Sequence, residues 1–321
     1  MRLILKLYYR MRRSTPSQFR PVVLVTGCGS GIGLALASLL HAQRHYRVVV
    51  TSRRSSLAVL RKRFIEDERF WIRPLDVTSD PERRALIEEI EAKWGGVNIL
   101  INNAGISFRS VLEHMNEEEE LMQLDVNYLA PMALARLVLP RMRSVGRGKI
   151  INVSSVSGML AMPTMASYSA SKHALEGASE SLWHEVRPFG IDVSLIQPGF
   201  VRSKSFERVH LSERSKESLR SRGTYSDYYS NMTPFIERLM GLSLTTPEMI
   251  ARKILRVIRT EDPPLFLPAT HDAVLFTLLR RLVPRRLLLP LLFRCLPAAA
   301  RWGEYDSHSR KHGFAHRKAA A

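Results

Sequence analysis

The fold of this chain is decided by residues 22–33, which read Val-Val-Leu-Val-Thr-Gly-Cys-Gly-Ser-Gly-Ile-Gly. The first four residues form a continuous apolar run, as a strand buried on both faces requires. Gly27, Gly31 and Gly33 then allow the backbone to turn tightly and to approach a pyrophosphate at a helix N-terminus. The helical pattern of residues 34–40 follows at once. We therefore expect a dinucleotide-binding strand, turn and helix here, rather than an ordinary glycine-rich turn.

Six further strand patterns alternate with helical patterns along the chain. The predicted strands are Val48–Thr51, Phe70–Val77, Val97–Ile101, Lys149–Val153, Asp192–Ile196 and Leu265–Pro268. Such alternation predicts an α/β fold with one Rossmann-like, doubly wound parallel sheet of about seven strands. Among the helices, we expect Thr78 to cap one that spans Asp80–Trp94, and Thr246 to cap one that runs to about Arg259.

The second strand ends in Ser52-Arg53-Arg54, without a nearby Asp or Glu. A carboxylate at this place binds the ribose 2′-hydroxyl of NAD, whereas arginine suits the 2′-phosphate of NADP. We therefore predict NADP(H), with Arg53 as the leading phosphate ligand and Arg54 as the alternative, and NAD(H) as the less favoured cofactor. The competing interpretation is that both arginines simply face solvent.

Tyr168 and Lys172 are four residues apart in a run that favours a helix. Residues at this spacing lie on the same helix face. An ammonium group beside a phenol stabilises the phenolate and lowers its pKa from about 10. Such a tyrosine can exchange a proton with a substrate hydroxyl or carbonyl near neutral pH. The spacing alone is a weak signal, because any solvated helix face can carry it.

Polar and small residues follow several of the predicted strands. Ligands bind outside the carboxyl ends of the strands in an open α/β sheet, so these residues are candidates for the site. They are Asp76, Asn102-Asn103-Ala104-Gly105, Ser154-Ser155 and Gln197–Ser203. Asn127 is a polar residue in a largely apolar segment, so it needs hydrogen-bond partners.

Together, these motifs resemble the short-chain dehydrogenase/reductase superfamily over about residues 21–205. The motifs are Thr-Gly-x3-Gly-Ile-Gly at 26–33, Asp76 before Val77, Asn102–Gly105, Asn127, Ser155, Tyr168-x3-Lys172 and Pro198-Gly199. The tract from Ile150 to Ser203 is most similar to the 17β-hydroxysteroid and retinol dehydrogenase branch.

The resemblance implies a role for each catalytic candidate. Tyr168 is the acid/base, Lys172 lowers its pKa and bonds the nicotinamide ribose, and Ser155 holds the substrate oxygen. Asn127 holds the water that links Lys172 to solvent. No metal is expected.

The resemblance also implies where the cofactor lies. With Arg53 and Arg54, the expected cofactor-binding residues are Gly27, Ser30, Gly31, Ile32, Gly33, Asp76, Val77, Asn103, Ala104, Gly105, Tyr168, Lys172, Pro198, Gly199, Val201 and Ser203. Asp76 and Val77 face the adenine, and the segment from Pro198 to Ser203 faces the nicotinamide. Ser30 departs from the basic residue that NADP-preferring members often have. Ser203 replaces a threonine and keeps its hydroxyl.

Composition bounds the domain organisation. The chain has 321 residues, 45% of them apolar, which suits one large α/β domain over 21–270. Its two cysteines are far apart, without zinc or redox spacing, so we expect a reducing, cytoplasmic location. The formal charge of +18 favours anionic partners. Residues 1–20 form a basic segment without acidic residues, read as an interfacial helix, a disordered tail or a targeting presequence.

Three further segments lie towards the C-terminus. Residues 204–245 mix aromatic, methionine and polar side chains, which predicts a mobile substrate lid or, alternatively, ordinary packed helices. Residues 271–303 predict basic amphipathic helices broken at Pro284 and Pro290. These suit peripheral association with a membrane, or packing over the substrate cleft or a partner subunit. Residues 304–321 predict a disordered tail.

The leading functional hypothesis is an oxidoreductase that transfers hydride between NADP(H) and a lipophilic alcohol or ketone, such as a steroid, retinoid or long-chain acyl compound. One alternative keeps the fold but acts on a small polar carbonyl. Another is a non-catalytic nucleotide-sensing or nucleic-acid-binding protein, although no nucleic-acid recognition motif is apparent and no specific nucleic-acid partner is expected. The resemblance implies a homodimer or homotetramer.

Overall fold

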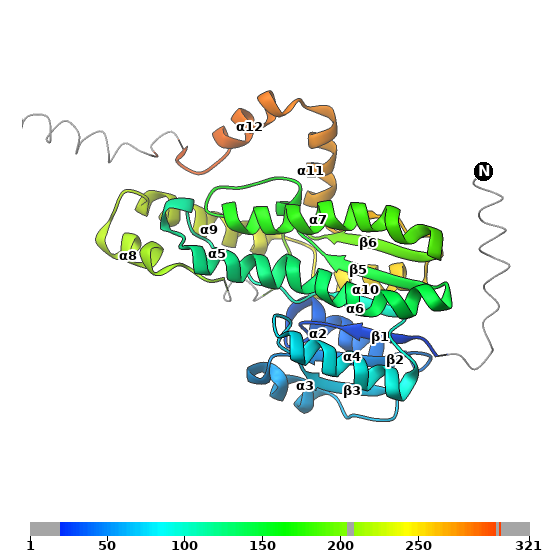
Figure 1. Ribbon diagram of the computed structural model, residues 1–321. Coiled ribbons are helices and arrows are strands. Elements are labelled where there is room, and N and C mark those ends of the chain that lie inside the picture. Colours follow the sequence, from blue (N-terminus) through cyan, green and yellow to red (C-terminus); the bar gives the residue numbers. More distant parts are fainter. Residues whose placement is uncertain (1–19, 204–208, 300–301, 303–321) are drawn as a thin grey trace, which may run out of the picture.

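The computed structural model describes residues 20–203, 209–299 and 302. The predicted N-terminal segment, apart from Arg20, and the predicted tail 304–321 lie outside these ranges. Seven parallel strands form one sheet in the order β3-β2-β1-β4-β5-β6-β7 (Figure 1). The strands are β1 (Val22–Val25), β2 (Arg47–Ser52), β3 (Phe70–Pro74), β4 (Ile99–Asn102), β5 (Gly148–Val153), β6 (Ile191–Gln197) and β7 (Phe266–Pro268). This confirms the expected doubly wound parallel sheet.

Helices cover both faces of this sheet (Figure 1). They are α2 (Gly31–Ala42), α3 (Leu57–Arg63), α4 (Asp80–Trp94), α5 (Glu117–Leu124), α6 (Ala130–Val145), α7 (Ala166–Val186), α8 (Glu213–Ser221), α9 (Ser226–Leu242), α10 (Pro247–Arg259), α11 (His271–Leu282) and α12 (Arg285–Arg294). None of these described helices is both long and apolar enough to cross a bilayer.

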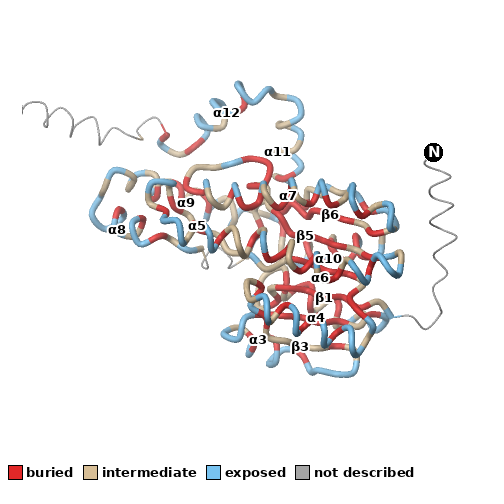
Figure 2. The backbone as a smooth tube through the Cα atoms, in the orientation of Figure 1, coloured by how far each residue is buried: buried red, intermediate tan, exposed pale blue. Residues whose placement is uncertain are grey.

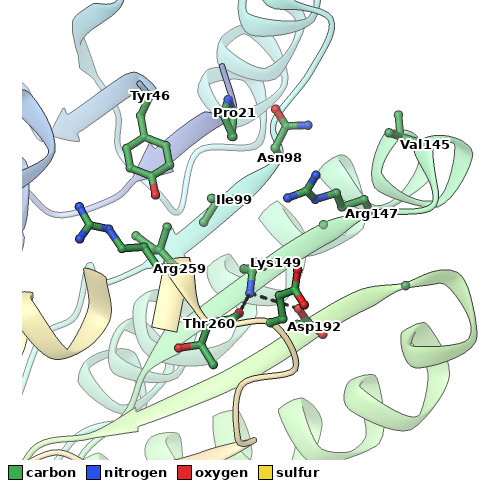
Figure 3. A pocket seen from close by; sticks show the side chains of 14 residues that line it. Pro21, Tyr46, Asn98, Ile99, Val145, Arg147, Lys149, Asp192, Arg259 and Thr260 are labelled. Carbon is green, nitrogen blue, oxygen red and sulfur yellow. Dashed lines mark hydrogen bonds and ion pairs between the residues drawn. The ribbon is translucent and has the colours of Figure 1, made fainter. Parts of the chain in front are cut away.

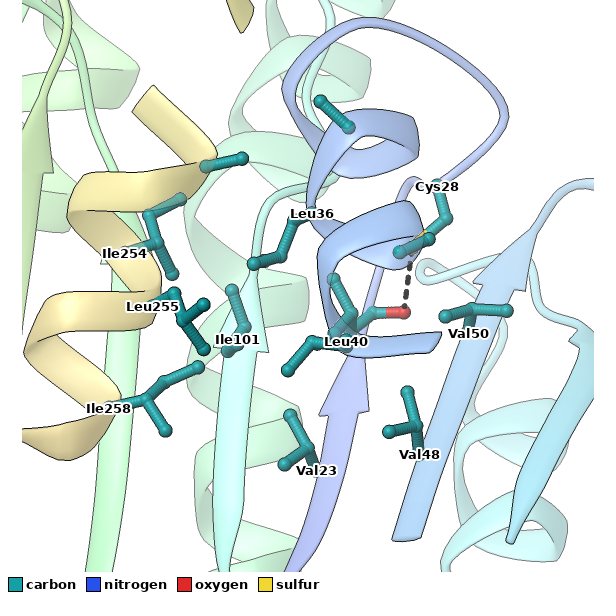
Figure 4. Close-up of a cluster of buried hydrophobic side chains, with 14 of the residues drawn as sticks. Val23, Cys28, Leu36, Leu40, Val48, Val50, Ile101, Ile254, Leu255 and Ile258 are labelled. Carbon is teal, nitrogen blue, oxygen red and sulfur yellow. Dashed lines mark hydrogen bonds between the residues drawn. The ribbon is translucent and has the colours of Figure 1, made fainter. Parts of the chain in front are cut away.

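The apolar runs of the strands supply the core on both faces of the sheet. Strand β1 is buried along its length (Figure 2). All four residues of β4 are buried as well. On one face, Leu36 of α2 and Ile254 of α10 belong to one buried cluster with Ile101 (Figure 4). On the other face, helices α4, α6 and α7 pack in a second cluster. Burial on both faces explains why the central strands read as continuous apolar runs.

Cys28 is part of the first cluster. Its thiol is fully buried and donates a hydrogen bond to the Val25 carbonyl oxygen at 3.4 Å (Figure 4). Burial raises the pKa of Cys28 to about 12. The residue is therefore an inert packing side chain of the glycine turn.

The start of α4 differs from the expectation. The third strand ends at Pro74 instead of Val77, and Ser79 caps α4 by accepting a hydrogen bond from the Glu82 amide. Thr78 does not cap, because its hydroxyl and its amide both bond the Asp76 carboxylate, at 2.8 and 3.0 Å. A local Asx turn thus replaces the last residues of the predicted strand.

The C-terminal helices also differ in one point. Pro284 separates α11 from α12 as predicted, but Pro290 lies inside α12 instead of ending it. A proline inside a helix removes one backbone hydrogen bond and its ring crowds the preceding turn. Burial of Leu288 against Met159 and Leu160 holds the helix in place. Most of α11 and α12 projects from the body of the protein and is exposed (Figure 2).

Helices α8 and α9 occupy the described part of the predicted lid. Tyr229 is buried, and its hydroxyl bonds the Val111 amide, His114 Nδ1 and Ser215 Oγ at 3.0, 2.9 and 2.8 Å. Met232 is 1% exposed. These two side chains therefore serve packing between α9 and the body of the domain.

Candidate active site

Three of the predicted catalytic residues meet at the carboxyl edge of the sheet. Ser155 follows β5, while Tyr168 lies in the first turn of α7 and Lys172 one turn later. The Tyr168 hydroxyl is hydrogen-bonded to the Ser155 side chain. Lys172 Nζ donates to the Val153 carbonyl oxygen at 3.0 Å and lies 5.9 Å from the centre of the Tyr168 ring. The arrangement places a phenol, a hydroxyl and an ammonium group around one point.

The pKa of Tyr168 departs from the expectation. Burial raises it above its ordinary value of 10, and this outweighs the lowering by the Ser155 hydrogen bond and by the charge of Arg109. Lys172 was expected to lower this pKa. Its ammonium group instead bonds the Val153 carbonyl, and burial remains the largest effect on the pKa of Tyr168.

Lys172 itself is strongly affected by its surroundings. It is 4% exposed, and burial lowers its pKa to about 8, against which the charge of Glu176 raises it. The pKa of Glu176 is raised by burial. Glu176 follows Lys172 by one further helical turn, so Tyr168, Lys172 and Glu176 share one face of α7.

Asn127 lies in a π-helical segment, Asp125–Leu129, between α5 and α6. Its Nδ2 donates to the Ile106 carbonyl oxygen at 2.9 Å and to Ser171 Oγ at 3.0 Å, and its Oδ1 accepts from the Ile106 amide. A π-bulge inside a helix is frequent at functional sites. The predicted need of Asn127 for partners is thus met by the loop after β4 and by α7.

The glycine turn has the shape predicted for it. Gly27 and Gly31 adopt positive φ angles of 70° and 53°. A Cβ at Gly33 would lie 2.3 Å from the Gly27 carbonyl oxygen, so only glycine fits. Asn103 Nδ2 donates to the Thr26 and Gly27 carbonyl oxygens at 2.9 and 3.0 Å, which anchors the turn. A Cβ at Gly31 would meet no atom within 4 Å, so the turn faces open space where a pyrophosphate fits. Ser30 stands at the N-cap position of α2, followed by Gly31 and Ile32 in its first turn.

The predicted 2′-phosphate ligands lie just beyond β2. Arg53 is exposed, whereas Arg54 forms an ion pair with Glu82 at 3.0 Å. The other oxygen of Glu82 accepts from the Asp76 amide at 2.7 Å. The fold therefore brings a carboxylate from α4 to the strand end that lacked one in sequence. The side chain of Val77 is buried and lines a small pocket together with Ala104, where the resemblance places the adenosine.

The segment from Pro198 to Ser203 is braced from α11. The Gly199 amide donates to Thr270 Oγ1, and the Phe200 amide donates to the Asp272 carboxylate, both at 2.9 Å. A Cβ at Gly199 would overlap this carboxylate. The Pro198 carbonyl accepts from the Val156 amide at 2.8 Å, which ties this segment to the loop of Ser155. Val201 is buried, and Ser203 ends the first described range.

Sequence reasoning missed three kinds of residue at this site. Glu176 stands four residues after Lys172, and this helical spacing is the signal that could have identified it. Thr270 and Asp272 carried no local signal, because they act on a segment about 70 residues away. Arg109, whose charge acts on Tyr168, lies in the loop after β4 and had no motif. Gly105 was named only as a cofactor residue, but a Cβ there would lie 3.1 Å from Asn127 Oδ1.

A cavity lies at the opposite, amino-terminal edge of the sheet (Figure 3). Its volume is about 310 Å³, and it is lined by the starts of β4, β5 and β6 and the end of α10. None of the predicted site residues lines it. Lys149, in its wall, is paired with Asp192 at 3.2 Å. Ligands of open α/β sheets bind at the other edge, so this cavity is not the active site.

Comparison with known proteins identifies the family. A sequence model described as short chain dehydrogenase matches residues 21–214. The chain belongs to the short-chain dehydrogenase family. It is therefore an oxidoreductase with a nucleotide-binding Rossmann-type fold, which confirms the resemblance that its motifs carry.

Two curated relatives illustrate the similarity. The chain is 34% identical over 243 residues to 3-ketodihydrosphingosine reductase of Bacteroides thetaiotaomicron, covering 76% of this chain and 85% of that protein. It is 32% identical to dehydrogenase/reductase SDR family member 7B of Danio rerio, covering 69% of this chain and 74% of the relative.

Solved structures agree. A short-chain dehydrogenase from Streptomyces avermitilis superposes with a TM-score of 0.69 at 31% identity, covering 92% of this chain and 99% of that one. A metagenomic short-chain oxidoreductase in complex with NADP superposes with a TM-score of 0.58 at 25% identity, covering 78% and 98% of the two chains.

Proposed function

We propose that this chain is an NADP(H)-dependent oxidoreductase that acts on a lipophilic alcohol or ketone. The observation that carries the proposal is the meeting of Tyr168, Ser155 and Lys172 at the edge of the sheet that also holds the glycine turn. The Tyr168 hydroxyl can give its proton to a carbonyl oxygen whose carbon receives a hydride, so we propose carbonyl reduction as the reaction.

In this mechanism the chain supplies the proton and the positioning. When bound, the reduced cofactor supplies a hydride to the carbonyl carbon. Tyr168 gives its hydroxyl proton to the developing alkoxide, and Ser155 Oγ donates a hydrogen bond to the same oxygen. Lys172 presents a buried ammonium group for the nicotinamide ribose. The first-turn amides of α2 and the open side of Gly31 would hold the pyrophosphate.

Two observations support NADP(H) over NAD(H). Arg53 is exposed at the end of β2 and available for a 2′-phosphate, while Arg54 is engaged by Glu82. A solved relative at 25% identity holds NADP. Arg53 is therefore the proposed ligand. Glu82 acts in the opposite sense, because its carboxylate reduces the positive charge near the expected position of the 2′-phosphate.

Two observations support a lipophilic substrate. Apolar side chains follow two segments of the site: Met159 and Leu160 come after Ser155 and lie in one buried cluster, and Phe200 comes after Gly199 and packs against the cluster that contains Met232. The name of the relative from Bacteroides thetaiotaomicron states reduction of 3-ketodihydrosphingosine.

A substrate panel with purified full-length protein and NADPH tests the function. The panel includes 3-ketodihydrosphingosine, a steroid ketone, retinal and a small polar carbonyl, with Tyr168→Phe as the control. We expect NADPH consumption with a lipophilic member and a loss of about 10²-fold or more in Tyr168→Phe, because the variant lacks the proton. If the protein reduces only the small polar carbonyl, the proposed lipophilic substrate class is wrong. No turnover together with no binding of either nucleotide would favour the non-catalytic alternative.

We further propose that α11 and α12 rest on an anionic membrane surface. Eight large apolar side chains on these helices are 45–78% exposed: Val274, Leu275, Leu278, Leu282, Leu287, Leu289, Leu291 and Phe293. Five arginines, Arg280, Arg281, Arg285, Arg286 and Arg294, accompany them, and Asp272 is the one acidic residue of the two helices. Leucine with arginine suits acyl chains below anionic headgroups, whereas a second copy of this surface would bring like charges together.

Co-sedimentation with vesicles tests this surface. We expect the protein to pellet with vesicles of phosphatidylcholine and phosphatidylglycerol, less at high salt, and weakly with phosphatidylcholine alone. The double variant Leu278→Gln/Leu282→Gln should weaken binding, while the exposed control Leu244→Gln should not. If both variants bind the vesicles equally well, the overall charge of +18, and not the surface of α11 and α12, would explain the binding.

A further inference from the structure

Glu176 joins three segments of the candidate active site. It lies on α7, 8% exposed, and its Oε1 accepts hydrogen bonds from Ser154 Oγ at 2.7 Å and from Gln197 Nε2 at 2.9 Å. Ser154 precedes Ser155, and Gln197 precedes Pro198. One carboxylate oxygen thus holds the ends of both β5 and β6.

The loop after β5 closes tightly over this carboxylate. A Cβ at Gly158 would lie 2.4 Å from Glu176 Oε1 and 2.8 Å from Ser154 Oγ. The loop backbone therefore approaches the carboxylate as closely as a glycine allows. A buried carboxylate held this tightly is costly unless its charge is offset.

Charged groups from several elements act on Glu176 and its neighbour Lys172. His173 on α7 and Arg280 on α11 lower the pKa of Glu176, which favours its charged form. Lys172 gains its counter-charge from Glu176. The charge of Arg109, in the loop after β4, lowers the pKa of Tyr168. From α5, the Glu120 carboxylate accepts a hydrogen bond from Ser167.

We propose that Glu176 is a positioning residue of the active site: its negative charge stabilises the buried Lys172 ammonium group, and its Oε1 holds the segments that carry Ser155 and Pro198. The charge and the two hydrogen bonds to Oε1 are separable, because glutamine keeps one acceptor oxygen for these bonds, replaces the other oxygen by NH2 and removes the charge. The proposal rests on the role proposed above for Lys172, but one of its tests does not.

The first test is the free energy of unfolding against pH, from urea titrations of full-length wild type and Glu176→Gln. The pKa of Lys172 is about 8 in the folded state and 10.5 ordinarily, so the unfolded chain binds more protons between these values. The stability of the wild type should therefore begin to rise with pH near 8, and above pH 9 the buried Cys28, whose pKa is raised to about 12, opposes this rise. Without the carboxylate the pKa of Lys172 falls further, so the rise should begin at lower pH in Glu176→Gln.

The second test is the pH dependence of NADPH-linked reduction. We expect the alkaline loss of activity to move to lower pH in Glu176→Gln, since Lys172 loses its proton earlier. Ser154→Ala removes a hydrogen bond but keeps the charge, so it should lower stability without moving either pH dependence. Glu180→Gln, an exposed site on the same helix, should match the wild type in both.

An unchanged onset of the stability rise in Glu176→Gln would overturn the proposal and leave Glu176 a packing residue. If the protein reduces no substrate, the unfolding series still decides the role of Glu176. In that case only the proposed oxidoreductase activity would fail.

Discussion

At the scale of single residues, the site combines Tyr168, Lys172 and Glu176, and burial favours the uncharged form of each. The pKa of Lys172 is lowered to about 8, and the pKa values of Tyr168 and Glu176 are raised. For Lys172 the departure from 10.5 corresponds to about 3 kcal/mol of lost stability while the group is charged. Strongly shifted groups gathered at the edge of a sheet are typical of an active site.

Replacing Lys172 by methionine should make the protein more stable and less active. Methionine has a similar length and no charge to bury, so the free energy of unfolding near pH 7 should rise by roughly 1–3 kcal/mol. The stability rise of the wild type that begins near pH 8 should be missing in the variant. Urea titrations at several pH values measure both effects. A variant less stable than the wild type at pH 7 would show that the Lys172 hydrogen bond to Val153 outweighs the cost of burial.

At the scale of elements, each part of the site depends on how one segment packs against another. The turn between β1 and α2 is fixed by the Asn103 side chain from the end of β4. The segment after β6 is held by the start of α11. Helix α9 is tied to the loop around η2 (Leu112–His114) through the Tyr229 hydroxyl.

Gly33→Ala should deform the turn between β1 and α2. The new methyl group would lie 2.3 Å from the Gly27 carbonyl oxygen and 2.5 Å from Asn103 Nδ2, so the backbone must move. We expect a loss of about 1–3 kcal/mol in stability and weaker NADPH binding. Gly177→Ala is the matched control, because a Cβ on this glycine of α7 meets nothing within 4 Å. The control should gain about 0.5–1 kcal/mol, and equal losses in both variants would contradict the steric argument.

Tyr229→Phe should loosen α8 and α9 from the domain. It removes the hydroxyl that bonds Val111, His114 and Ser215, leaving buried polar groups without that partner. The expected cost is about 1–3 kcal/mol, with faster hydrogen exchange concentrated in α8 and α9. The Tyr228 hydroxyl bonds no described residue, so Tyr228→Phe should leave exchange unchanged. Uniform exchange changes across the whole sheet would argue against a local anchor.

At the scale of the whole molecule, the two edges of the sheet carry different features. The carboxyl edge carries the glycine turn, the candidate catalytic residues and the C-terminal helices (Figure 1). The amino edge carries a cavity that none of the predicted site residues lines. Cofactor binding at the carboxyl edge would therefore join segments from β1 to α11 and stabilise the whole domain.

NADPH should raise the melting temperature more than NADH. A ligand at one hundred times its dissociation constant adds about 2.7 kcal/mol of stability, which is roughly 5–10 °C for a domain of this size. At equal concentrations we expect the larger shift with NADPH, and Arg53→Asp should remove the difference. Differential scanning fluorimetry measures it. A larger shift with NADH would contradict the assignment of Arg53 as the 2′-phosphate ligand. It would leave the proposed roles of Tyr168 and Lys172 unchanged.

Much of the fold could be read from local sequence. The apolar runs, the glycines at 27, 31 and 33 and the alternation of strands with helices predict the seven-stranded sheet, because burial and backbone conformation leave a short-range pattern. The order of motifs likewise predicts the meeting of Ser155 with Tyr168, since the carboxyl ends of parallel strands share one edge. The errors of the prediction are local, at the end of β3, at Thr78 and at Pro290.

Other properties of the site were decided only by the tertiary structure. The sequence near Arg54 lacks a carboxylate, yet packing of α4 brings Glu82 to it. The spacing of Tyr168 and Lys172 predicts a lowered tyrosine pKa, yet burial raises it, and Glu176 becomes the counter-charge of Lys172. The physical reason is that a pKa depends on desolvation and on charges from segments distant in sequence. Only the packing of those segments against one another sets either of them.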